Sequence, residues 1–178
     1  MLQTIEIWTA AASPRGIVKL AREVEGRGWD GLAVVDSQNL SGDPYVALAM
    51  AATATKRIGL ATAVTNSVTR QAAATATAIA SVQRVAGGRA VLGIRRGDSA
   101  LAHLGRAPGR VAHFERYLRH LQAYLRGEAV PFDAINIPLD IAPPLSELHL
   151  ADAPMDSRNS WMAGTEKCRW KSRRPATG

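Results

Sequence analysis

Two arginines, a glycine and two polar residues follow an apolar run in the stretch RAVLGIRRGDSAL, near the middle of the chain. An arginine carries a planar guanidinium group, which suits a phosphate because it can donate two parallel hydrogen bonds. A glycine lets the backbone approach a ligand closely, and an aspartate and a serine add polar contacts. The stretch therefore predicts a site for a polar or anionic ligand, built from Arg95, Arg96, Gly97, Asp98 and Ser99.

Polar residues also follow two earlier apolar runs. Asp36 ends the run GLAVVD, and Thr65 and Asn66 lie at the end of the run RIGLATAVT. In parallel α/β proteins the ligand site lies beyond the carboxyl ends of the strands. We therefore expect these three residues and the segment 95–99 to converge on one rim.

The elements that must position these residues alternate between strand and helix. Apolar runs predict strands at residues 4–10, 31–36, 57–65 and 89–94. Helical patterns follow each of them, at residues 13–28, 43–55, 70–88 and 109–127. Strict alternation favours an α/β fold with a parallel sheet and right-handed crossovers. Two architectures fit: a complete doubly wound sheet, or the first half of a (β/α)8 barrel, which needs roughly 250 residues.

Caps and apolar stripes give more detail about these helices. Ser13-Pro14 and Asp43-Pro44 each predict a helix start, because the first residue caps the amino end and proline suits the first turn. The last helix has an apolar stripe, made of Val111, Phe114, Leu118, Leu121 and Leu125. His113 and His120 lie on its outward face, where we expect them to be solvated rather than to bind a metal.

The βα pattern stops near Pro131. The following residues offer at most one short strand, around residues 139–142, before Pro143-Pro144. The last 28 residues show neither period and are rich in basic residues. We therefore divide the chain into a βα domain at residues 1–130 and an irregular segment at 131–178, which we expect to be poorly ordered. A truncated or altered reading frame is one explanation for the break.

Composition narrows the class of protein. The chain has 178 residues, of which 47% are apolar and 21% charged, and it contains one cysteine, Cys168, which excludes an internal disulfide. The net charge is +7, but +3 of it comes from six basic and three acidic residues after position 150. This placement argues against nucleic-acid binding. We expect no membrane segment and no secretory signal, and hence a cytoplasmic protein.

Three stretches resemble the bacterial-luciferase-like family: GWDGLAVVD, TAVTNSVTRQAAATATAIASVQRVAGGRAVLGIRRGDSALAHLG and LQAYLRGEAV. The family contains flavin-dependent monooxygenases and coenzyme F420-dependent reductases, and the branch most similar is that of methylenetetrahydromethanopterin reductase. The resemblance implies a (β/α)8 barrel, of which residues 1–130 would form the first four βα units. It also implies an oxidoreductase that transfers a hydride between F420 or FMN and a small organic substrate.

The resemblance implies roles for the residues at the expected rim. Asp36 matches an acidic position near the cofactor ring, and Ala63-Val64 matches the place of a non-prolyl cis peptide bond against the ring. Thr65 and Asn66 would offer hydrogen bonds at the ring edge, and Arg96 matches the arginine that holds the flavin phosphate. The remaining contacts would come from Gly97, Asp98 and Ser99. The sequence assigns no catalytic residue and no metal ligand.

The sequence also departs from the family pattern. Arg95 stands where the reductase branch usually has glycine, so its side chain either faces solvent or enters the ring pocket. Gln71 and Ala72 replace a common His-Pro pair, and the last four strands of the barrel are absent or unrecognisable.

Asp36 and the pair Asp98-Ser99 could also be plain caps. A non-catalytic remnant, or a cofactor-binding or assembly module, is therefore the alternative to an enzyme. The open strand edges favour a homodimer.

Overall fold

The computed structural model describes residues 5–12, 14–131, 145–146 and 160–162. Its main sheet has five parallel strands in the order β1-β2-β3-β4-β7. The strands are β1 (Trp8–Ala11), β2 (Gly31–Val34), β3 (Gly59–Asn66), β4 (Ala90–Arg95) and β7 (Ser160–Met162). A separate antiparallel pair joins β5 (Val130–Pro131) to β6 (Leu145–Ser146). The predicted parallel α/β sheet is confirmed.

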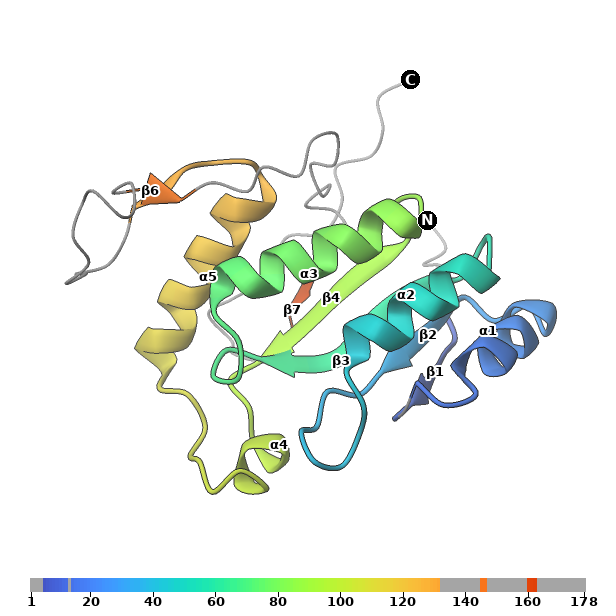
Figure 1. Cartoon of the computed structure of the whole chain (residues 1–178), viewed down its shortest axis with the longest axis horizontal. Coiled ribbons are helices and arrows are strands. Elements are labelled where there is room, and N and C mark those ends of the chain that lie inside the picture. Colours follow the sequence, from blue (N-terminus) through green and yellow to red (C-terminus); the bar gives the residue numbers. More distant parts are fainter. Residues whose placement is uncertain (1–4, 13, 132–144, 147–159, 163–178) are drawn as a thin grey trace.

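Three helices connect the first four strands and cover one face of the sheet (Figure 1), namely α1 (Ile17–Gly26), α2 (Pro44–Ala54) and α3 (Ala72–Val85). The single turn α4 (Ser99–Ala102) and α5 (Val111–Leu125) follow β4, and α5 packs against α3. Among the described residues, no helix combines the length and the apolar character that a bilayer crossing requires.

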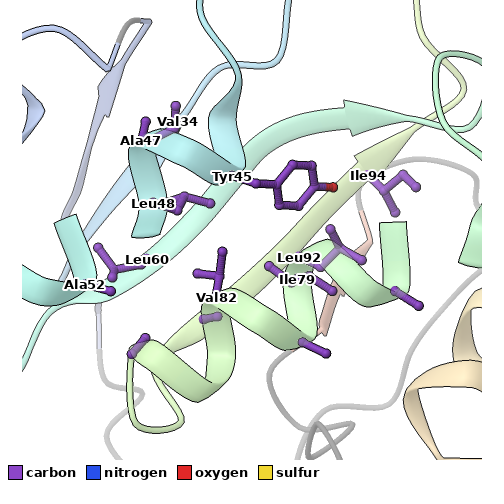
Figure 2. Close-up of a cluster of buried hydrophobic side chains, with 14 of the residues drawn as sticks. Val34, Tyr45, Ala47, Leu48, Ala52, Leu60, Ile79, Val82, Leu92 and Ile94 are labelled. Atoms are coloured by element: carbon purple, nitrogen blue, oxygen red, sulfur yellow. The ribbon is translucent and has the colours of Figure 1, made fainter. Parts of the chain in front are cut away.

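The main core lies between this helical layer and the sheet. Leu60 and Leu92 project from β3 and β4, and they meet Leu48 of α2 and Ile79 of α3 (Figure 2). All four side chains are fully buried. The helix-facing side of the sheet is therefore closed, so the carboxyl ends of the strands are fixed relative to one another.

On the opposite face of the sheet, Trp8 lies over two glycines of the neighbouring strands. A Cβ atom added at Gly31 or Gly59 would collide with the indole of Trp8. The two glycines thus make room for the Trp8 ring to lie across the beginnings of β2 and β3. This face would be the inside of a barrel, and Trp8 covers its amino-terminal end.

The helix boundaries confirm one predicted start and correct the other. Asp43 caps α2 as expected, because its Oδ1 accepts hydrogen bonds from the amides of Tyr45 at 2.8 Å and Val46 at 3.3 Å. The predicted start of α1 at Ser13-Pro14 is wrong, since the helix begins at Ile17. Gly16 precedes it with a φ of 76°, and that left-handed residue turns the chain before the helix can form.

Two further differences concern the later part of the chain. Val111 is 54% exposed, so it does not belong to the buried stripe of α5, where Tyr117 and Tyr124 are buried instead. The strand β7 pairs with β4 in parallel, although no period in the sequence predicts a strand at these three residues. The short strand expected at residues 139–142 lies outside the described residues.

Candidate functional site

Asp36 lies just beyond β2 and is a buried carboxylate, with 3% of its surface exposed. Its Oδ2 accepts a hydrogen bond of 2.6 Å from the Thr65 hydroxyl, and its Oδ1 accepts one of 2.6 Å from Gln38 Nε2. Burial raises the pKa of the Asp36 carboxyl, and the hydrogen bond from Thr65 opposes that rise only in part. Asp36 is thus a fixed acidic group that joins the ends of β2 and β3.

The end of β3 departs from regular strand geometry. The peptide bond between Ala63 and Val64 is cis, as the resemblance implied. The register against β4 shifts between Thr62 and Thr65, and Thr62 Oγ1 replaces the missing ladder bonds. It donates to the carbonyl of Gly93 at 2.8 Å and accepts from the Gly93 amide at 2.9 Å. The irregularity is therefore held in place by β4.

Asn66, at the end of β3, orders the loop that follows. Its Oδ1 accepts hydrogen bonds from the amides of Val68 at 3.0 Å and Thr69 at 2.9 Å, and from the Thr69 hydroxyl at 3.1 Å. Backbone donors on one side fix which side-chain atom is oxygen. The buried Nδ2 has no hydrogen-bond partner among the described residues. Asn66 therefore keeps a free amide donor at the strand ends.

Two glycines give the backbone a close approach at the end of β4. A Cβ at Gly93 would collide with the carbonyl of Thr62. Gly97 has a φ of 84°, and a Cβ there would meet Leu101 and Asn66. Both positions require glycine, and Gly97 forms a turn that brings the 97–100 backbone beside Asn66.

These residues surround one hollow of about 170 Å³ beyond the ends of β2, β3 and β4, which we call the strand-end hollow. Its described lining includes eight of the nine predicted residues: Asp36, Ala63, Val64, Thr65, Asn66, Gly97, Asp98 and Ser99. The convergence predicted from the strand ends is thus present. Arg95 also lines the hollow, whereas the sequence left open whether its side chain faces solvent or enters the pocket.

The structure separates the two arginines. Arg95 lines the hollow with a half-exposed side chain and lies 3.9 Å from the Asp98 carboxylate. Arg96 is not part of the described lining, and its Nη1 donates to the carbonyl of Gly109 at 3.3 Å. Alternation of side chains along β4 explains the difference, because neighbouring residues point to opposite faces of a strand. Asp98 precedes α4, but its carboxylate makes no capping bond there.

Two residues of this region were not predicted in their observed roles. Gln38 donates a hydrogen bond to the Asp36 carboxylate. No pattern in the sequence predicts this contact between residues two positions apart. His113 is exposed, as expected, and its Nε2 also lies 3.1 Å from the carbonyl of Ser67. The sequence did not predict this contact, because it depends on the packing of the loop after β3 against the amino end of α5, and helical periodicity does not report on such a contact.

The chain matches the family model described as luciferase-like monooxygenase over residues 2–158. It is 40% identical over 84 residues to 5,10-methylenetetrahydromethanopterin reductase from Methanolobus tindarius, covering 47% of this chain and 26% of that protein.

Solved structures share the fold. The coenzyme F420-dependent tetrahydromethanopterin reductase from Methanopyrus kandleri aligns with a TM-score of 0.66 and 22% identity, over 74% of this chain and 43% of that one. The oxygenating constituent of 3,6-diketocamphane monooxygenase from Pseudomonas putida, in complex with FMN, aligns with a TM-score of 0.64 and 16% identity, over 82% of this chain and 44% of that one. The chain thus spans less than half the length of these proteins, and its sheet corresponds to part of their fold.

Proposed function

The chain belongs to the luciferase-like monooxygenase family, and from that premise we propose that its strand-end hollow binds the ring of coenzyme F420 or FMN. The proposed activity is that of an oxidoreductase acting on a small organic substrate. The observation that carries the proposal is the convergence of Asp36, Thr65, Asn66 and Gly97 on one hollow.

The described residues fit a planar heteroaromatic ring with polar edges. Asn66 Nδ2 is a buried donor without a partner among the described residues, and a ring carbonyl would satisfy it. The Thr65 hydroxyl donates a hydrogen bond to Asp36, and its oxygen can still accept one from a ring N–H. Gly97 lines the hollow with backbone atoms alone, since Leu101 and Asn66 fill the space that a side chain there would take. Together these groups give the hollow both donors and acceptors at the strand ends.

The chain's own part in the reaction is to bind and orient. A bound flavin or deazaflavin supplies the hydride or electron chemistry. Ala63 and Val64 give the hollow an apolar wall that excludes water from the ring face. Asp36, held by Thr65 and Gln38, fixes the hydroxyl that meets the ring edge. Arg96 is proposed as the phosphate contact, since it makes one hydrogen bond among the described residues and its guanidinium has further donors.

We favour F420 over FMN as the cofactor. The Methanolobus reductase shares 40% identity with this chain over the stretch that it matches, whereas the FMN-bound Pseudomonas structure shares 16%. Both cofactors carry a phosphate, so Arg96 does not distinguish between them.

The test is a titration of the full 178-residue chain with FMN and with F420, followed by ring fluorescence. We expect saturable binding of at least one cofactor at micromolar concentration. Asn66→Asp keeps the size of the side chain but replaces the free donor by an acceptor, and should weaken binding about tenfold. The exposed Asn39, in the loop after β2, provides the matched control Asn39→Asp.

A second variant separates ring from phosphate contacts. Arg96→Met should weaken binding of both cofactors, while Arg22→Met on the exposed face of α1 should not. The proposal fails if neither cofactor binds at about 100 µM, a concentration that corresponds to a weak affinity of about 5 kcal/mol. It also fails if Asn66→Asp and Asn39→Asp bind the cofactor equally well.

Binding without turnover is the second candidate function. The strand-end hollow is small for a ligand site, and its described walls come from three strand ends. A protein of this kind would hold the cofactor but leave it open to solvent. Turnover of the reduced cofactor distinguishes the two functions, because an enzyme should consume it repeatedly when an organic acceptor is present and a binder should only hold it.

We also infer that the chain forms a homodimer through α2. This helix contains no charged residue, and its outer side leaves Val46 53% and Met50 41% exposed. A helix that is apolar all round is normally covered on every side. Light scattering on the purified chain should give twice the monomer mass, and Met50→Lys should reduce it to the monomer value. A monomeric wild-type chain would overturn this inference.

A further inference from the structure

A second and larger hollow lies away from the strand-end hollow. It has a volume of about 760 Å³ and runs between the loop before α3, the first turn of α3 and one flank of α5. We call it the α3–α5 groove. Its described lining shares no residue with the strand-end hollow. The two hollows are therefore built from different side chains.

The lining of the α3–α5 groove is strongly basic. Three arginines and two histidines face it, namely Arg70, Arg106, Arg116, His113 and His120. They come from three separate segments of the chain, and no aspartate or glutamate stands among the described lining residues. Three guanidinium groups in one lining attract anions, although an ion pair with Asp43 offsets the charge of Arg70.

Packing fixes several of these basic groups in place. Arg70 pairs with Asp43, and its guanidinium carbon lies 4.9 Å from the centre of the Tyr45 ring. His113 Nε2 lies 3.1 Å from the carbonyl of Ser67. Arg106 makes no ion pair with any residue that the structure describes, so its charge is available to a ligand. The groove thus combines the fixed guanidinium of Arg70 with that of Arg106, which has no ion pair within the described part of the chain.

Hydroxyl and amide groups complete the lining. Ser67 is 97% buried, and its Oγ has no hydrogen-bond partner within the described part of the chain. The helix α3 has 14 residues, and Gln71 at its amino end makes no capping bond, so the first-turn amides lack an intrahelical acceptor. Amides at a helix start together with arginines are the usual donors to a phosphate.

The floor of the groove adds no negative charge. The Tyr117 hydroxyl donates to Thr75 Oγ1 at 2.6 Å and so ties α5 to α3. Burial raises the pKa of Tyr117 to about 12, so the phenol stays neutral at physiological pH. The two helices are therefore joined beneath the basic side chains by an uncharged contact.

We propose that the α3–α5 groove is a second ligand site, which binds a small metabolite carrying a phosphate or diphosphate group. Arg106, Arg116 and Arg70 would contact the phosphate oxygens, and Ser67 and the start of α3 would donate neutral hydrogen bonds. The volume lies within the range of about 300–1,000 Å³ that small-molecule sites occupy. The site is independent of the strand-end hollow and of the redox cofactor.

The test is calorimetric titration of the full chain with inorganic pyrophosphate, with sodium chloride at equal ionic strength as the reference. We expect saturable binding of pyrophosphate that weakens as salt is added. The double variant Arg106→Gln/Arg116→Gln should lose at least about tenfold in affinity, because two charge-assisted contacts are removed. Ser67→Ala should lose about threefold while the circular dichroism spectrum and the melting temperature stay unchanged.

Arg119 provides the matched control, because it lies on α5, pairs with Glu115 and is 72% exposed outside the groove. Arg119→Gln should bind pyrophosphate as the wild type does. The proposal is overturned if the wild-type chain gives no saturable heat. It is equally overturned if Arg119→Gln loses as much affinity as the double variant, since the effect would then be one of net charge.

Discussion

The two edges of the parallel sheet use polar groups in opposite ways. At the amino edge, the Arg89 guanidinium donates to the carbonyls of Ile58, Thr55, Ala52 and Ala86 at 2.7–3.3 Å, and to the Thr55 hydroxyl at 3.1 Å. At the carboxyl edge, a carboxylate is buried at Asp36, while Asn66 and Ser67 keep buried atoms without partners in the described chain.

Glu25 completes the amino edge. Its Oε1 accepts hydrogen bonds from three consecutive amides, those of Lys56, Arg57 and Ile58, at 2.8, 2.6 and 3.3 Å. Gln83 Oε1 accepts a hydrogen bond from the Ala90 amide at 2.7 Å. These side chains close the loops before β3 and β4, where the backbone has no ladder partner.

We propose that the difference reflects different roles of the two edges, one in folding and the other in ligand binding. Unpaired buried groups cost stability, and a fold keeps them where a ligand will later satisfy them. In barrel enzymes the amino edge contributes stability and the carboxyl edge binds and reacts. We therefore expect substitutions at the amino edge to weaken folding, and those at the carboxyl edge to change binding with little loss of stability.

The largest effect should come from Arg89→Met. The variant leaves four backbone carbonyls without their donor, and we expect the free energy of unfolding to fall by about 3 kcal/mol. Urea denaturation followed by circular dichroism measures it. Arg22→Met, on the exposed face of α1, should change the same quantity by less than about 0.5 kcal/mol. Equal effects of the two variants would remove the distinction between the edges.

Glu25→Gln should have a smaller effect of the same sign. Desolvation raises the pKa of Glu25, but the three amide donors outweigh it and the net pKa is lowered. An acid with a lowered pKa stabilises the fold above its ordinary pKa and loses that contribution as the pH falls through the lowered value. We expect a loss of about 1.5 kcal/mol at pH 7, and a smaller loss in denaturation at pH 3. Glu23→Gln, on the same helix, is the control.

Asp36→Asn should move stability in the opposite direction. The pKa of Asp36 is raised by burial, so its charge costs stability above the raised pKa, and the cost disappears as the pH falls towards 3.8. We expect the variant to be about 1 kcal/mol more stable than the wild type at pH 7, and equal to it near pH 3.5. A less stable variant at pH 7 would place Asp36 with the structural residues of the other edge.

Ser67→Ala should have the smallest effect on folding. The hydroxyl has no partner among the described residues, so its removal should change the free energy of unfolding by less than about 0.5 kcal/mol. Thermal melting at pH 7 measures the change. Ser41→Ala is the contrasting variant, because that hydroxyl donates to backbone carbonyls at 3.0 and 3.3 Å and accepts from the Ser37 amide at 3.1 Å. A large loss in Ser67→Ala alone would show a structural role.

The amino-acid sequence by itself determined the alternation of the first four strands with their helices and the residues that gather at the carboxyl edge. Asp36, Asn66 and Gly97 follow apolar runs, and any parallel sheet brings such positions together. Asp43 caps α2 because a cap needs only its own neighbours along the chain. Each of these predictions depends on interactions between residues close in sequence, or on one rule of topology.

Only the tertiary structure decided the remaining features. It placed Arg95 in the strand-end hollow and turned Arg96 towards Gly109, it paired β7 with β4, and it brought His113 to Ser67. These outcomes depend on the register shift in β3 and on how loops pack against helices far away in the chain. Hydrophobic periodicity says which side of an element is buried, but it does not say which distant group a polar side chain will meet.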